Sequence, residues 1–249
     1  MQQANRYRWT SGGATDRGRL RARNQDAFLD QPDRGLWAVA DGMGGHQDGG
    51  RASQLLVQRL GSLTTAELQA DAVAAVTRVL QQANTELWQA STDAGGDIIG
   101  STVVVMSVAG RQAALLWAGD SRAYRLREGI LAQLTRDHSQ VQTLVDHGLL
   151  SAAEAERHPF ANVLARAIGG ERAIQIDSRV EPIEAGDRYL LCSDGLTREL
   201  SLPEITRLLA SDLSAPDRMQ QIAGALVQTA CAAGGRDNVT AVVIDMAAD

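Results

Sequence analysis

Lysine is absent from this sequence of 249 residues, in which all 24 basic side chains are arginine. A P-loop that holds phosphate with its lysine is therefore excluded, as is any mechanism that forms a Schiff base. The formal net charge of −6 disfavours nucleic acid as the main partner.

Cysteine and long apolar runs are also scarce. Cys192 and Cys231 lie in apolar surroundings and lack any metal-site spacing, so two reduced, buried thiols are expected. No apolar run approaches the roughly 20 residues needed to cross a bilayer, and the polar start M-Q-Q-A-N-R has no signal-peptide core. We therefore expect a cytoplasmic protein that does not bind membranes.

The composition and hydrophobic periodicity predict a globular α+β protein. Apolar residues make up 44% of the chain, and its length fits one domain over residues 1–249. Apolar spacing predicts helices over Arg51–Leu63, 66–90, Pro203–Ala210 and Asp217–Ala232.

The β-rich runs V-V-V-M-S-V, A-A-L-L-W-A-G-D, S-R-A-Y-R-L and I-L-A-Q-L are joined by short turns and predict an antiparallel meander. Further strands are expected near Ile174–Val180, Arg188–Cys192 and Val239–Ile244, and residues 1–13 suit a loose start or an edge strand. The predicted fold is a four-layer sandwich, with two mostly antiparallel sheets stacked between helices.

Four aspartates, far apart in the sequence, lie next to apolar runs. Asp41, Asp120 and Asp194 follow such runs, and Asp237 comes just before another. An aspartate followed by glycine after a single strand is usually just a turn. With four aspartates at predicted strand ends, spacing alone supports two interpretations equally: ordinary turns, or one shared metal site.

Carboxylate oxygens favour hard cations such as Mg²⁺ or Mn²⁺. Gly42 has no Cβ, so its carbonyl can turn toward an ion and a bulky anion can approach. Two such ions about 3.5–4 Å apart can activate water and offset charge on a phosphoryl group. The chemistry indicated is metal-assisted hydrolysis of a phosphate ester.

Eight motifs, in order from Thr15 to Ile244, resemble the bacterial PPM (PP2C-type) metal-dependent protein Ser/Thr phosphatases. They are T-D-R-G-x-x-R-A-x-N-Q-D-A, V-A-D-G-M-G-G-H-x-x-G-x-x-A-S, G-S-T, A-G-D-S-R-A-Y, L-T-x-D-H-S, N-V-L-x-R-A-I-G, L-C-S-D-G-L and R-D-N-V-T. The resemblance implies the PP2C-like sandwich and a metal-dependent phosphatase acting on phosphoserine and phosphothreonine through a metal-activated water.

The resemblance also implies the metal ligands. Asp41 would bridge two Mn²⁺ or Mg²⁺ ions, and Gly42 would contribute its carbonyl to one of them. Asp194 and Asp237 would hold the other ion, while Asp120 and Asp194 would hold a possible third.

Other residues of the resemblance would act beside the metals. Arg21 matches the arginine that binds substrate phosphate, a role that suits its planar fork. Asp26 matches the acid that orients the attacking water, and Asn238 would support the site. His46 is a candidate general acid, because the position directly after Asp41-Gly42, where animal members carry histidine, is Met43 here.

Two further positions allow simpler explanations. Gln25 replaces a glutamate common in relatives, so one acidic contact near the second metal becomes neutral. His138 suits a structural or capping role, and most arginines of the segment Thr15–Phe28 could simply form a solvated face.

Residues 139–165 correspond to the family's flap, which is proposed to affect substrate choice. Expected partners are phosphorylated proteins and a cognate eukaryotic-like Ser/Thr kinase; type VI secretion is one setting, by analogy alone. With no coiled-coil segment, a monomer is expected. The alternatives are a non-catalytic binding module and a stress-response phosphatase acting on an anti-sigma antagonist. Retention of every ligand position argues against the first, and a length that leaves no room for a sensor domain argues against the second.

Overall fold

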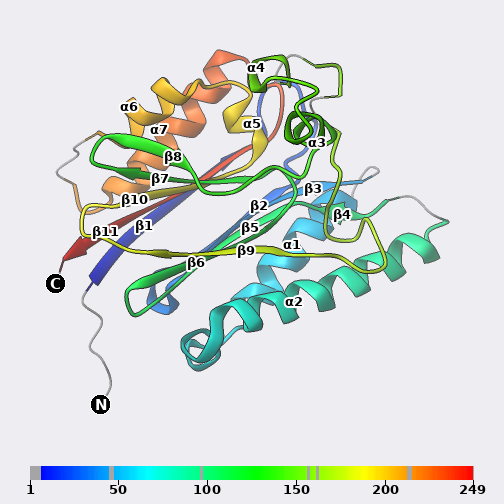
Figure 1. Ribbon diagram of the computed structural model, residues 1–249, viewed down its shortest axis with the longest axis horizontal. Helices are drawn as coiled ribbons and strands as arrows, with labels where there is room; N and C mark the ends of the chain where they lie inside the picture. Colours follow the sequence, from blue (N-terminus) through cyan, green and yellow to red (C-terminus); the bar gives the residue numbers. More distant parts are fainter. Residues whose placement is uncertain are drawn as a thin grey trace.

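Two antiparallel sheets lie face to face in the computed structural model (Figure 1). The structure describes residues 7–44, 48–95, 98–155, 158–160, 163–211 and 215–248. Within these residues, no helix combines the length and the apolar character needed to cross a membrane.

The first sheet has five strands in the described part of the chain, in the order β1-β11-β10-β7-β8. Their bounds are β1 Tyr7–Asp16, β7 Arg122–Arg127, β8 Ile130–Gln133, β10 Arg188–Cys192 and β11 Val239–Ala248. Of the loose start or edge strand expected over residues 1–13, the edge strand is confirmed from Tyr7 onward, where β1 lies at the sheet edge and pairs with β11 along its whole length; residues 1–6 lie outside the described residues.

The second sheet has six strands within the same described ranges, in the order β2-β3-β5-β6-β9, with β4 paired to β3. Their bounds are β2 Asp26–Gln31, β3 Leu36–Met43, β4 Gly100–Ser101, β5 Val103–Ala109, β6 Gln112–Ala118 and β9 Asp177–Pro182. A short 3₁₀ helix, η1 (Pro32–Arg34), joins β2 to β3.

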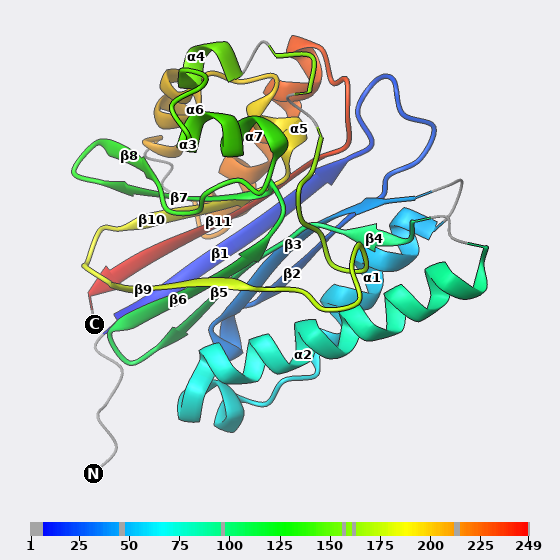
Figure 2. The same cartoon turned by 45° about the vertical axis from the view of Figure 1, so that its right-hand side comes forward.

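Helices cover the outer faces of both sheets, which completes the predicted four layers (Figures 1 and 2). α1 and α2 lie on the second sheet, and α5, α6 and α7 lie on the first; α3 and α4 fall in the segment 139–165. Their bounds are α1 Asp48–Gly61, α2 Thr65–Asp93, α3 Gln140–Asp146, α4 Ala152–Ala155, α5 Asp194–Thr197, α6 Leu202–Leu209 and α7 Arg218–Ala233.

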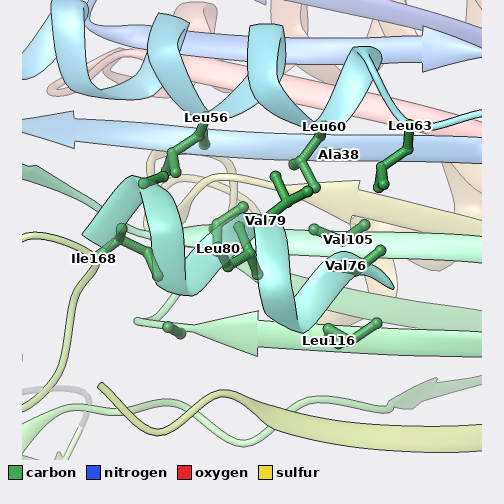
Figure 3. Packing of buried hydrophobic residues seen from close by; sticks show 14 of the residues in the cluster. Ala38, Leu56, Leu60, Leu63, Val76, Val79, Leu80, Val105, Leu116 and Ile168 are labelled. Carbon is green, nitrogen blue, oxygen red and sulfur yellow. The ribbon is translucent and has the colours of Figure 1, made fainter. Parts of the chain in front are cut away.

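Three apolar clusters separate the four layers. Between the sheets, Trp37, Leu115 and Tyr189 are fully buried together. A second cluster joins α1 and α2 to the second sheet (Figure 3), and a third joins α5–α7 to the first. Each sheet buries both of its faces and each helical layer buries one, and this burial is what fixes the stacking.

The predicted meander is wrong between β6 and β7. β5 and β6 form a hairpin in the second sheet, but the chain then crosses to the first sheet, where β7 and β8 pair. Gly119 makes the crossing with φ +114, and a Cβ there would lie 2.5 Å from the Thr102 side chain. Periodicity detects strands but cannot say in which of two stacked sheets a strand lies.

Some predicted boundaries also shift. The strand expected at Ile174–Val180 is β9, which begins at Asp177, because Ile174 packs in the helix-covered core instead. The first predicted helix begins at Asp48 rather than Arg51. The second, α2, contains a kink at Asp71, whose carboxylate accepts a hydrogen bond from Ala74 N at 2.9 Å.

Candidate metal-binding site

Five aspartates from different elements come together at one end of the sheets. Asp41 lies in β3, and desolvation by burial is the largest cause that raises the pKa of its carboxyl. The negative charges of four other aspartates raise this pKa further; from the largest effect to the smallest, they are Asp26, Asp194, Asp120 and Asp237. The acids that are dispersed in the sequence are therefore gathered in one electrostatic environment.

The first pair of acids is set by strand register. Asp26 in β2 and Asp41 in β3 are directly opposed in the antiparallel ladder. The Oδ2 atom of Asp26 accepts hydrogen bonds from Ser193 Oγ at 2.8 Å and Thr240 Oγ1 at 2.7 Å. Its Oδ1 atom is buried and accepts no hydrogen bond from the described residues.

Asp120 is carried by the turn where the chain changes sheets. The neighbouring Gly119 N donates to His138 Nδ1 at 3.1 Å, and His138 N donates to Gly119 O at 2.9 Å. The other ring nitrogen of His138 lies 3.3 Å from Asp177 Oδ2. The structural role expected of His138 is thus confirmed: it braces the turn that holds Asp120.

Asp194 and Asp237 are linked by arginine. Arg198 directly follows α5, one turn after Asp194, and forms ion pairs with Asp194 and, at 3.0 Å, with Asp237 Oδ2. Arg21 Nη2 donates to the same Oδ2 atom at 2.7 Å. The second oxygen of Asp194, Oδ1, is buried and accepts nothing from the described part of the protein.

Asn238 ties the segment between β1 and β2 to the start of β11. Its Nδ2 donates to Arg17 O at 2.8 Å and Arg23 O at 2.9 Å, and its Oδ1 accepts from Gln25 N at 2.8 Å. One buried amide therefore satisfies three backbone groups of the segment that carries Arg21.

Gly42 is confined by its neighbours. A Cβ at this position would lie 1.9 Å from Gly49 O, at the start of α1, and 2.8 Å from Gln25 O. Gln25 O also accepts hydrogen bonds from Gly42 N at 3.2 Å and Ser53 Oγ at 2.5 Å. Gln25 thus positions the Asp41-Gly42 segment through its backbone.

Burial and mutual repulsion dominate the electrostatics of the acids. Burial raises the pKa of Asp26 to about 7, although the hydroxyls of Thr240 and Ser193 oppose the shift. Burial and neighbouring carboxylates raise the pKa of Asp41 and of Asp120 well above the ordinary value. Burial also raises the pKa of Asp194, with Arg198 opposing. These four carboxylates are thus costly to ionise until positive charge arrives.

The donor set fits a hard divalent cation. It consists of carboxylate oxygens, two of them buried without a hydrogen-bond donor, and it lies beside a glycine backbone. Among the described residues, however, no three Asp, Glu, His or Cys side chains already lie close enough together to coordinate one metal ion. Arg21 and Arg198 supply the nearby positive charge, through bonds to Asp194 and Asp237 that a cation would share or replace.

Most predicted site residues fall in this region. Arg21, Asp26, Asp41, Gly42, Asp120, Asp194, Asp237 and Asn238 all do so. His46 lies outside the described residues and stays a prediction.

Sequence reasoning missed Arg198, Ser193 and Thr240. Ser193 and Thr240 stand inside two of the motifs, L-C-S-D-G-L and R-D-N-V-T, and the signal for Arg198 was its i,i+4 spacing from Asp194.

Comparison with known proteins extends these observations. Residues 18–228 match the family model described as protein phosphatase 2C. The serine/threonine phosphatase stp of Listeria monocytogenes is 35% identical over 241 residues, which cover 93% of this chain and 93% of that protein. The pairwise match thus spans more of the chain than the family model does.

Two solved structures are similar over nearly the whole chain. PppA, a key regulatory component of T6SS in Pseudomonas aeruginosa, has a TM-score of 0.87 and 37% identity, and the match covers 96% of this chain and 97% of that one. The catalytic domain of the serine threonine protein phosphatase PstP, in complex with two manganese ions, has a TM-score of 0.83 and 34% identity, covering 97% and 99%.

Proposed function

Because the chain belongs to the protein phosphatase 2C family, we propose that it is an active, metal-dependent phosphatase that removes phosphate from phosphoserine and phosphothreonine. The observation that carries this proposal is the gathering of five aspartates from separate elements around Asp41. A purely structural role gives no reason to bury carboxylates against one another at such a cost.

The proposed cofactors are two Mn²⁺ or Mg²⁺ ions, with a possible third. Asp41, Gly42, Asp194 and Asp237 would hold the pair, and Asp120 with Asp194 would hold the third. Bound there, the ions would activate water and offset charge on the phosphoryl group. The PstP domain, which is similar over nearly the whole chain, was solved with two manganese ions, and this supports the proposal.

The remaining site residues handle substrate and water. Arg21 is exposed and lies against Asp237, so its planar guanidinium can meet an arriving phosphate with two parallel hydrogen bonds. Asp26 keeps its Oδ2 occupied by two hydroxyls, which leaves Oδ1 to orient the attacking water and accept its proton. Asn238 acts through the segment that carries Arg21.

The proposed partners are phosphorylated proteins and a cognate Ser/Thr kinase whose products this chain would dephosphorylate. Likeness to PppA makes the regulation of type VI secretion one setting to test. We propose that the chain works as a cytoplasmic monomer, as a single domain with the flap at 139–165.

The test is hydrolysis of a phosphothreonine peptide by protein treated with chelator and then given Mn²⁺. Asp194→Asn is compared with Asp33→Asn, an exposed aspartate on η1. We expect activity that depends on Mn²⁺, is lost in Asp194→Asn and is kept in Asp33→Asn. Absence of turnover with every divalent cation tried would contradict the proposal and favour a non-catalytic binding module.

A further inference from the structure

The segment Arg17–Arg23, between β1 and β2, is an arginine-rich loop beside the candidate site. It reads R-G-R-L-R-A-R, and no acid lies between Asp16 and Asp26. Its four arginines are exposed. We call this segment the arginine loop; in both views it lies next to the chain that enters β11 and carries Asp237 (Figures 1 and 2).

The arginine loop is held in place by its backbone. Arg19 N donates to Gly235 O at 2.7 Å, and Asn238 binds the carbonyls of Arg17 and Arg23. Gly18 has φ +75, and a Cβ there would lie 2.0 Å from Asp237 O. Its exposed side chains are therefore displayed from a fixed backbone, which lowers the entropy that binding a ligand would cost.

The positive charge of the loop is mostly not neutralised. Within the described ranges, Arg21 is the only one of its four arginines with an ion pair, to Asp237. Arg17 Nη1 and Arg19 Nε reach only backbone carbonyls, each at 3.4 Å. The exposed side chain of Arg23 has no partner among the described residues. Many of the other described arginines are paired with acids, as in Arg59–Glu86 and Arg122–Asp137.

The surroundings make this charge useful. The arginine loop lies at the rim of the site, where a fixed positive charge attracts acidic side chains of an approaching phosphopeptide. An extended peptide rises about 3.3 Å per residue, so side chains two to four positions from the phosphorylated residue lie about 7–13 Å from it. That reach suits arginines on the same short loop as Arg21. Leu20, which is 73% exposed, adds an apolar contact between them.

We propose that the arginine loop selects substrates, favouring phosphopeptides with acidic side chains or a second phosphate within a few residues of the phosphothreonine or phosphoserine. This inference rests on the proposed function and deepens it. Arg17, Arg19 and Arg23 recognise the flanking charges, while Arg21 remains with the phosphate that is removed.

The test compares two phosphothreonine peptides that differ only in having Asp or Ala at the flanking positions. The readout is the ratio of their kcat/KM values, from which the amount of active enzyme cancels. At low salt we expect the acidic peptide to be favoured about fivefold to tenfold by the unmodified chain, from a few partly exposed charge pairs. The ratio should fall toward one as salt shortens the Debye length below about 10 Å.

The double variant R17Q/R23Q should lower the ratio to about twofold. Arg23→Glu, which changes the charge of the arginine loop by the same two units, should lower the ratio at least as far, because a like charge then faces a flanking acid of the peptide. The matched control is Arg207→Gln, which replaces an exposed arginine of α6. Because α6 lies apart from the arginine loop in both views (Figures 1 and 2), this variant should keep the ratio of the unmodified chain.

The outcomes separate this inference from the proposed function. Turnover of both peptides with equal kcat/KM, or a ratio that R17Q/R23Q leaves unchanged, would overturn the role of the arginine loop and leave the phosphatase assignment standing. No turnover of either peptide with Mn²⁺ would overturn the proposed function itself.

Discussion

Asp26 and Asp41 are cross-strand partners, with paired Cα positions in the antiparallel ladder of β2 and β3. Directly opposed residues project to the same face of a sheet, so the two carboxylates point the same way. The largest cause that raises the pKa of Asp41 is burial, and the second largest is the negative charge of Asp26. One register therefore creates a repulsive pair that a cation would relieve.

Replacing Asp41 should raise the thermal stability of the metal-free protein and abolish its activity. Asp41→Asn removes a half-buried carboxyl whose ionisation is disfavoured by desolvation and by four neighbouring aspartates, so the metal-free variant should melt at a higher temperature than the unmodified protein. The same variant should lose turnover and its stabilisation by Mn²⁺, which for the unmodified protein is about 2.7 kcal/mol at a hundred times Kd. Thermal melts with EDTA and with Mn²⁺, beside a peptide assay, check this. Near-normal turnover in Asp41→Asn would remove Asp41 from the site.

Replacing Arg21 should act mainly on substrate binding. Arg21→Ala removes an exposed guanidinium that lies 2.7 Å from Asp237, and a lost phosphate contact weakens the ground state and the transition state alike. We expect KM to rise about tenfold with a small change in kcat. Arg21→Lys should reverse only part of the rise in KM, because an ammonium group cannot bind phosphate with two parallel hydrogen bonds. Steady-state kinetics with an unchanged KM would count against this role.

The metal-free protein should lose stability as pH rises. Burial raises the pKa of Asp26 from 3.8 to about 7 in the folded protein. Because the folded state holds this proton more tightly than the unfolded chain, the protonated carboxyl favours folding at low pH. That contribution should disappear between its ordinary pKa and about pH 7, with little further change above.

Urea unfolding in EDTA across this pH range measures the effect. The stability of Asp26→Asn should fall less over the same range, and the difference between the two curves isolates Asp26 from the other acids. Parallel curves for the two proteins would show that Asp26 is already ionised throughout.

Replacing Asn238 should loosen the segment that carries Arg21. Asn238→Ala leaves the carbonyls of Arg17 and Arg23 and the amide of Gln25 without a partner, which should cost about 3 kcal/mol of unfolding free energy. KM should rise as well, because Arg21 is then displayed from a less ordered backbone.

The matched control for Asn238 is Gln220→Ala. Gln220, on α7, also binds backbone, donating to Gly13 O at 2.8 Å and accepting from Gly13 N at 3.2 Å, but it supports β1 rather than the site. It should lower stability without raising KM. Equal KM values for the Asn238→Ala protein and the unmodified protein would confine Asn238 to a purely structural role.

Much of the candidate site could be predicted from the sequence, because most of its residues belong to short motifs of neighbouring positions. Four of the acids stand beside apolar runs, and eight motifs in order identified the family. Arg198 was missed because an arginine four residues after an aspartate is common on helices, and only the fold shows that it also reaches Asp237. The support of Asn238 for Arg17, over 221 positions of sequence, is likewise invisible to any local pattern.

The sequence by itself determined the layered α+β class, the family and most of the acids, because hydrophobic period and glycine chemistry act over a few residues. The tertiary structure decided which sheet each hairpin joins and which groups face each acid. It also showed that the arginines of the arginine loop are exposed, and that Arg21 is the one with an acidic partner in the described part of the chain. The physical reason is that burial and charge coupling depend on distances between elements, and only packing of the whole chain sets those distances.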